Sequence, residues 1–166
     1  MLLVMNMEYA LEYLDYLSSN KNYSKNTIDS YENALKKYYD YIDDKGIDFK
    51  SVCVDDIEKF LEFLKKINSP KTAYYTLTVL KNYYNYLIME KVVGENVFYN
   101  IDMPKLGHSL PSVLSYEEVD KLLDIKVIDA FTARNKAILE LMYASGLRIS
   151  ETVNLRLYDI DLTNNI

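Results

Sequence analysis

The sequence has one cysteine, Cys53, and no apolar run that approaches the length of a membrane span. A single cysteine cannot form an internal disulfide or a cysteine metal cluster, which fits a reducing compartment. We expect Cys53 to be a small packed residue near a helix start. The first residues lack a basic segment and a small-residue cleavage site, so a secretory signal is not expected. The sequence therefore predicts a cytoplasmic protein with no membrane partner and no bound metal.

Positive charge is also scarce, with 19 Lys and Arg residues against 25 Asp and Glu residues and a net charge of −6. A nucleic-acid-binding domain is more often basic, so the total counts against such a function. The distribution matters more, because the field near a surface is local. On charge alone, ordinary solvated lysines are the simpler interpretation. Two segments are nevertheless basic and free of acids: residues 16–28, with Lys21 and Lys25, and residues 63–89, with Lys65, Lys66, Lys71 and Lys81.

Strand-like alternation is absent from the first hundred residues, which show apolar residues at helical spacing instead. We therefore predict an all-α bundle of four to five helices. Capping residues and breaks define the helices. The first ends near Leu17, the second runs from Ser24 to Gly46, the third starts near Asp55 or Asp56, the fourth runs from Ser69-Pro70 to about Lys91, and a short helical turn is possible at Asn96–Tyr99.

Residues 101–112 hold two of the three prolines and separate the bundle from a second helical region. We interpret them as a linker. Beyond it, Ser115 and Glu118 form a capping box, and a helix from about Ala130 to Ala144 is apolar on most sides. Such a helix is expected to be buried, with Gly146 ending it and Ser150 capping the next helix. So small a region with so buried a helix is a poor independent domain, which suggests truncation.

The fourth helix has two chemically different faces. One face is apolar and should pack inward: Ala73, Leu77, Leu80, Tyr84 and Leu87. The opposite face has no carboxylate and carries Lys71, Tyr75, Thr78, Asn82 and Asn85, with Lys81 beside them. Lysine can contact phosphate, while Asn and Thr can reach phosphate or base edges, so this face suits a DNA groove. Any soluble helix has a polar face, so an ordinary solvated surface is the alternative interpretation.

The most informative stretch is Tyr143-Ala144-Ser145-Gly146-Leu147-Arg148-Ile149-Ser150-Glu151. It places Arg148 at a tight turn just before a new helix. A planar guanidinium held there can bind a phosphate diester through two hydrogen bonds, and Glu151 lies near enough to orient it. A structural Arg–Glu pair that holds the turn together is the alternative, and the residues alone leave both interpretations open.

The run ARNKAILELMYASGLRISETVNLRLYDIDL resembles the start of the catalytic domain of the tyrosine recombinase, or phage integrase, family, and in particular of its Xer type. In that family the YASGLRISE segment carries the first catalytic arginine. Upstream, LPSVLSYEEVDKLL resembles the segment that opens this domain, and YSKNTIDSYENALKKYYDYI resembles a helix entry in the SAM-like core-binding domain. The resemblance covers nearly the whole chain.

The resemblance implies a SAM-like core-binding domain over residues 1–100, a linker over 101–112 and an N-terminal fragment of the catalytic domain over 113–166. Members clamp duplex DNA, and a tyrosine forms a 3′-phosphotyrosyl link without a cofactor. Related recombinase subunits on the DNA would be further partners. Arg148 matches the first arginine, which binds the scissile phosphate, and Glu151 matches a supporting acid. The residues that would face DNA are Lys25, Asn26, Thr27, Lys71, Thr72, Tyr75, Thr78, Lys81 and Asn82.

Several family motifs are absent: the lysine of the following hairpin, the H-x-x-R motif and the segment with the nucleophilic tyrosine. None of the 17 tyrosines can be assigned as the nucleophile, and they are better interpreted as core and surface aromatics. We therefore expect the DNA-binding portion of a recombinase that is catalytically incomplete. A non-catalytic truncated DNA-binding protein and a helical protein–protein interaction module are the alternatives.

Overall fold

The computed structural model describes residues 2–104 and 112–160, and these contain helices and no strand. The predicted all-α fold is confirmed. The contacts divide the chain into two compact units, Met1–His108 (unit 1) and Ser109–Ile166 (unit 2). Most of the predicted linker, residues 105–111, lies outside the described residues. The helices of unit 1 are α1 (Leu2–Ser19), α2 (Lys25–Asp44), α3 (Val54–Ile67), α4 (Pro70–Met89) and the 3-10 helix η1 (Val97–Asn100). Those of unit 2 are α5 (Tyr116–Leu123), α6 (Ala130–Ser145), α7 (Ile149–Val153) and the 3-10 helix η2 (Leu157–Asp159).

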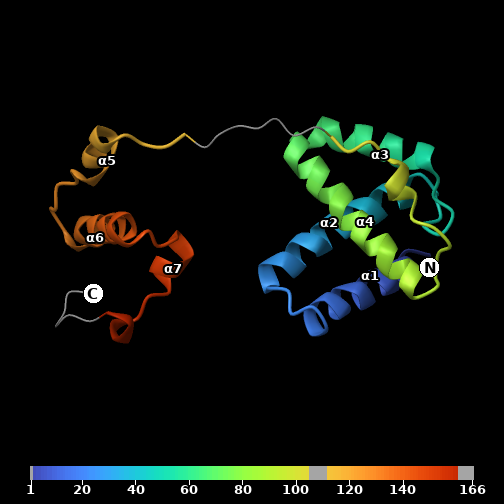
Figure 1. Ribbon diagram of the computed structural model, residues 1–166, viewed down its shortest axis with the longest axis horizontal. Helices are drawn as coiled ribbons and strands as arrows, with labels where there is room; N and C mark the ends of the chain where they lie inside the picture. Colours follow the sequence, from blue (N-terminus) through green and yellow to red (C-terminus); the bar gives the residue numbers. More distant parts are fainter. Residues whose placement is uncertain (1, 105–111, 161–166) are drawn as a thin grey trace. The chain divides into compact units, whose positions relative to one another are not determined.

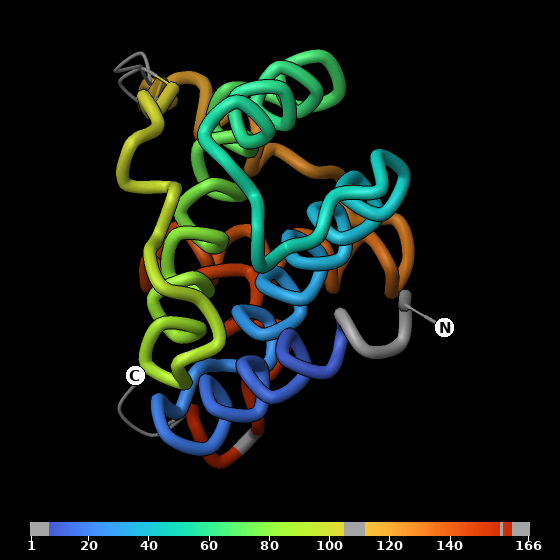
Figure 2. The backbone as a smooth tube through the Cα atoms, turned by 90° about the vertical axis from the view of Figure 1, so that its right-hand side faces the viewer, coloured from blue at the N-terminus to red at the C-terminus, as the bar shows by residue number. Residues whose placement is uncertain are grey.

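Unit 1 is built from two helical hairpins, α1–α2 and α3–α4, which pack through contacts of α4 with both α1 and α2 (Figure 1). The backbone trace in Figure 2 follows the same crossing helices. The predicted caps are confirmed, because Ser24 precedes α2 and Ser69 precedes α4, with Pro70 as the first helical residue. Gly46 follows α2 with φ of +65°, a conformation that glycine adopts without steric cost.

The core of unit 1 is rich in tyrosine. The hydroxyls of Tyr39 and Tyr83 lie 2.7 Å apart, and those of Tyr38 and Tyr84 lie 2.6 Å apart. Tyr84 also donates to the backbone carbonyl of Phe49 at 2.7 Å, so Tyr38 donates to Tyr84. The rings fill the core while each hydroxyl finds a partner, which removes the cost of an unpaired buried polar group.

The segment after α4 is fixed by a buried asparagine. Asn96 donates to the backbone carbonyl of Lys81 and to Asn85 Oδ1, both at 2.8 Å, and its Oδ1 accepts from the N–H of Phe98. The resulting η1 helix confirms the predicted short turn and presses Val97 and Phe98 into the core.

In unit 2, two predicted helix ends are confirmed and the expected burial of α6 is wrong. The Ser115–Glu118 capping box is confirmed, and Gly146 ends α6 in the left-handed conformation with φ of +67°. However, none of the side chains of α6 is buried, although its sequence predicts burial. Among the described residues, the helices packed most closely on α6 are α5 and α7, and these short helices cover too little of its apolar surface. Phe131 and Tyr143 therefore stay more than half exposed.

The expected packing of Cys53 is also wrong. Cys53 directly precedes α3 as predicted, but it is exposed and its thiol contacts Asp56 Oδ2 at 3.0 Å. That carboxylate also accepts from the Cys53 backbone N–H at 3.1 Å, so Cys53 caps the N-terminus of α3 and does not pack in the core.

Among the described helices, none combines the length and the apolar character that crossing a membrane requires.

Candidate functional site

The start of α2 presents exposed polar groups on a well-capped helix end. Ser24 Oγ accepts from the backbone N–H of Thr27 at 3.3 Å, and the two hydroxyls lie 2.9 Å apart. Lys25 and Asn26, predicted to face DNA, are exposed in this first turn. Thr27 is half-buried, and its hydroxyl belongs to the cap. The free N–H groups and the lysine together favour an anionic partner such as phosphate.

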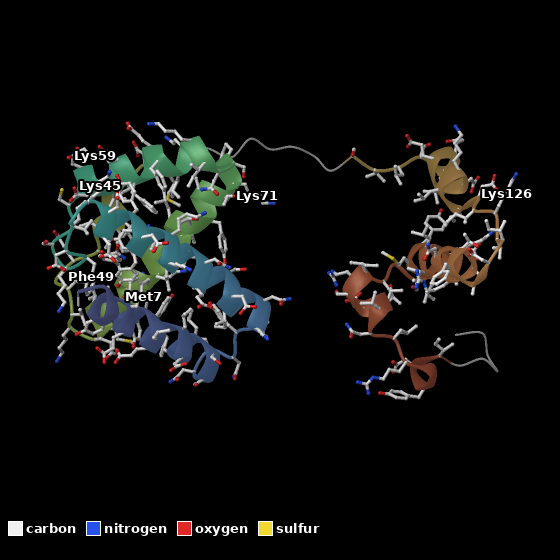
Figure 3. The ribbon with its side chains drawn as sticks, turned by 180° about the vertical axis from the view of Figure 1, so that it is seen from behind. Met7, Lys45, Phe49, Lys59, Lys71 and Lys126 are labelled. Carbon is white, nitrogen blue, oxygen red and sulfur yellow. The ribbon has the colours of Figure 1, made fainter. Side chains whose placement is uncertain are left out.

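The start of α4 repeats this arrangement. Ser69 Oγ accepts from the backbone N–H of Thr72 at 3.2 Å, and the hydroxyls again lie 2.9 Å apart. Lys71 is exposed at this end, opposite the end that holds Phe49 (Figure 3). Both helices begin on the same side of unit 1 (Figure 1). Two capped helix ends, each with an exposed lysine, therefore lie on one side of the bundle.

Tyr31 joins the two predicted segments. Its ring lies edge-on to Tyr75 of α4 at 6.3 Å and to Tyr23 of the α1–α2 loop at 5.9 Å. Its hydroxyl accepts from Asn82 Nδ2 at 3.4 Å. An open hollow of about 720 Å³ lies over this junction and is lined by neutral side chains: Asn22, Tyr23, Ser24, Asn26, Thr27, Ser30, Tyr31 and Tyr75. The structure thus brings the start of α2 beside the outer face of α4.

The outer face of α4 divides into free and occupied groups. Tyr75 and Asn82 are exposed, whereas Thr78 is half-buried and donates its hydroxyl to the Tyr74 carbonyl at 2.9 Å. Lys81 is half-buried, with its Nζ 4.0 Å from the centre of the Tyr99 ring. This cation–π contact holds the ammonium over the Tyr99 ring of η1.

Sequence reasoning missed the residues that organise this face. Tyr31 fits the inward stripe of α2, and it is indeed buried, so nothing in its spacing indicates that its hydroxyl holds a side chain of α4. The sequence around Tyr99 does not predict its role either, because the residues that Tyr99 contacts, Lys81 and Asn85, lie 14 or more positions away in the sequence. Lys21 and Tyr23 line a second hollow together with Asn82, which adds the α1–α2 loop to the candidate surface.

In unit 2, Arg148 lies at the turn between α6 and α7. It is the N-cap residue of α7, a place we had expected Ser150 to take, and Ser150 instead lies inside the helix. Glu151 explains the difference, because its Oε2 accepts from the Arg148 backbone N–H at 2.7 Å and its Oε1 accepts from Arg148 Nη1 at 3.0 Å. These bonds lower the pKa of Glu151, the backbone N–H first and the guanidinium second.

The Arg148 side chain is 81% exposed and pairs with Glu151 through Nη1 alone among the described residues. The pair is thus structural, as one interpretation required, and it still leaves the rest of the guanidinium free for an anion. A planar group oriented by a carboxylate can bind a phosphate through two parallel hydrogen bonds. Both interpretations of Arg148 are compatible with this geometry.

Comparison with known proteins places both units in one family. The model of the phage integrase N-terminal SAM-like domain matches residues 11–91, and the model of the phage integrase family matches residues 112–166. The first match covers α2, α3 and α4, and the second contains Arg148 and Glu151.

Relatives match along nearly the whole chain. A Caldanaerobacter subterraneus protein named for the tyrosine recombinases is 37% identical over 92% of this chain and 53% of its own length. Tyrosine recombinase XerD of Oceanobacillus iheyensis is 36% identical over 94% of this chain, and tyrosine recombinase XerC of Halalkalibacterium halodurans is 36% identical over 96%, in each case over 54% of the relative. The chain spans about half the length of these relatives. Because both helical units and the arginine turn match, the chain belongs to the phage integrase family of tyrosine recombinases.

Proposed function

We propose that unit 1 binds duplex DNA through the surface formed by the start of α2 and the outer side of α4. The contact of Tyr31 with Tyr75 and Asn82 carries this proposal, because it unites two segments that are otherwise separate. The residues assigned to the surface are Lys25, Asn26, Thr27, Lys71, Thr72, Tyr75, Thr78, Lys81 and Asn82. In this division, residues 1–100 are the core-binding domain, 101–112 the linker and 113–166 the start of the catalytic domain.

Local charge supports the proposal despite the net charge of −6. The segments that build the surface, residues 16–28 and 63–89, contain no carboxylate side chain. Asp29 lies nearby on α2 but does not line the hollow. Since a DNA backbone responds to the charge it meets within about 10 Å, the lysines of this surface outweigh distant acids.

For a longer protein that contains this chain, we propose site-specific DNA breakage and rejoining in the cytoplasm, with related subunits on the same DNA. Arg148 would bind the scissile phosphate and Glu151 would orient the guanidinium. Relatives that are named tyrosine recombinases support this activity class. This chain by itself should not cleave DNA, because its single histidine, His108, is not followed by an arginine at the third position and no tyrosine matches the nucleophile segment.

Removing two lysines tests the proposed surface. We expect the combined change Lys25→Ala and Lys71→Ala to weaken duplex binding by roughly 20- to 100-fold at low salt, because each exposed lysine contributes one phosphate contact. Fluorescence anisotropy with a labelled duplex measures the dissociation constant.

The matched control is Lys45→Ala with Lys59→Ala. It makes the same change in net charge, and both lysines are paired with acids at 3.0 and 2.6 Å, at a distance from Lys71 (Figure 3). We expect it to change the affinity by less than about threefold. Equal losses in both variants, or no loss in either, would contradict the assigned surface. A weak complex that neither pair affects would favour the helical interaction module.

A further inference from the structure

Two asparagines on the outer side of α4 differ in what they leave free. Asn85 donates from Nδ2 to the Tyr99 hydroxyl at 3.2 Å and accepts from Asn96 at 2.8 Å, so both ends of its amide have partners. Asn82 has one partner among the described residues, the Tyr31 hydroxyl at 3.4 Å, and uses one N–H for it. Its second N–H and its Oδ1 remain available at an exposed position.

The partner of Asn82 is itself held firmly. Tyr31 is 8% exposed, and its ring contacts Tyr13, Tyr23 and Tyr75 at 5.9 to 6.3 Å. These rings come from α1, the α1–α2 loop and α4. The hydroxyl that Asn82 meets therefore has a fixed position, and it limits the rotation of the amide about its last side-chain bond.

An amide that presents one donor and one acceptor side by side is selective among base pairs. In the major groove, adenine offers an acceptor at N7 and a donor at N6, which the two free groups of such an amide match at once. Guanine offers two acceptors on the same edge, so the amide oxygen would face another acceptor and could form no hydrogen bond there. Thr78, one turn earlier, has already given its hydroxyl proton to the Tyr74 carbonyl and presents lone pairs only.

We propose that Asn82 selects an adenine in the major groove and that Tyr31 is the positioning residue that orients its amide. This inference rests on the proposed DNA-binding surface and names the base that one residue of that surface recognises. Lys25 and Lys71 provide affinity for any sequence, whereas Asn82 distinguishes one base pair from the others.

Selection of duplexes from a randomised pool by the 166-residue chain tests this assignment. The unaltered chain should enrich adenine at one position, and individual duplexes changed there should bind roughly 5- to 100-fold more weakly. Asn82→Ala should remove the preference at that position only. Asn82→Asp, which presents acceptors alone, should move the preference toward cytosine, whose N4 donates.

Tyr31→Phe separates positioning from packing, because it keeps the ring and removes the hydroxyl. We expect it to reduce the adenine preference by about three- to tenfold while helix content and the melting temperature show a folded chain. An enriched guanine would overturn the proposal, since it would mean that the amide presents two N–H groups outward. The proposal would also be overturned if the Asn82→Ala chain selected duplexes with the same base preferences as the unaltered chain.

The outcomes also separate this inference from the function on which it rests. Binding that depends on Lys25 and Lys71 but shows no base preference at any position would overturn the role of Asn82 and leave the DNA-binding surface intact. Absence of duplex binding would overturn both.

Discussion

The bundle of unit 1 is expected to unfold cooperatively as the pH rises above about 10, where an ordinary tyrosine ionises. Burial raises the pKa of several core tyrosines well above that value, and neighbouring tyrosines raise it further for most of them. The groups concerned are Tyr13, Tyr38, Tyr39, Tyr83 and Tyr84, of which each is at most 3% exposed.

The sign follows from proton binding in the two states. Above pH 10 the unfolded chain releases protons that the folded core retains, so the stability that is fully present below pH 10 is lost as the pH rises. Each protected tyrosine lowers the stability by about 1.4 kcal/mol for every pH unit above 10, so the five together lower it by about 7 kcal/mol per pH unit. This loss is comparable to the whole stability of a small domain, about 5–15 kcal/mol.

An alkaline titration followed by tyrosinate absorbance and by circular dichroism measures this effect. The five buried tyrosines should ionise in one step above pH 10 that coincides with the loss of the helix signal. Gradual ionisation of all 17 tyrosines with the helix signal unchanged would contradict the hydrogen-bonded tyrosine core.

Tyr84→Phe is expected to cost about 2–4 kcal/mol of unfolding free energy. The ring and its packing remain, but the Phe49 carbonyl loses its donor and the Tyr38 hydroxyl loses its acceptor. Both groups are buried, where an unsatisfied polar atom carries its full desolvation cost. Urea unfolding monitored by circular dichroism gives the difference.

Tyr74→Phe is the matched control, since it makes the same chemical change on the same helix at a position that is 37% exposed. We expect it to change the stability by less than about 0.5 kcal/mol. Similar stabilities for the two variants would mean that the chain from Tyr38 through Tyr84 to Phe49 contributes little to the fold.

The helices of unit 1 could be predicted because their signals are local. Serine caps, a proline in the first turn and an apolar stripe act within a few residues, so Ser24, Ser69 and the buried side of α4 were all placed correctly. The hydroxyl pairs of the core could not be predicted, because Tyr39 and Tyr83 are 44 positions apart and their spacing resembles that of any inward residue.

Unit 2 shows the limit of local patterns in another way. An all-round apolar helix predicts burial, but burial needs a partner surface, and α5 and α7 supply too little of it for α6. At the candidate site, residue types alone predict which groups could contact phosphate and bases. Their proximity depends on Tyr31, and that contact follows only from the packing of α2 against α4.

The salt dependence of duplex binding by this chain tests the central claim most directly. The surface carries Lys21, Lys25, Lys71 and Lys81, so we predict that the logarithm of affinity falls with that of salt concentration with a slope of about −3 to −4. At physiological salt the dissociation constant for binding without sequence preference should be about 1–100 μM. Between about 50 and 200 mM salt it should rise roughly a hundredfold. A slope near zero, or no duplex binding at the lower salt concentration, would contradict the assignment of this face to DNA.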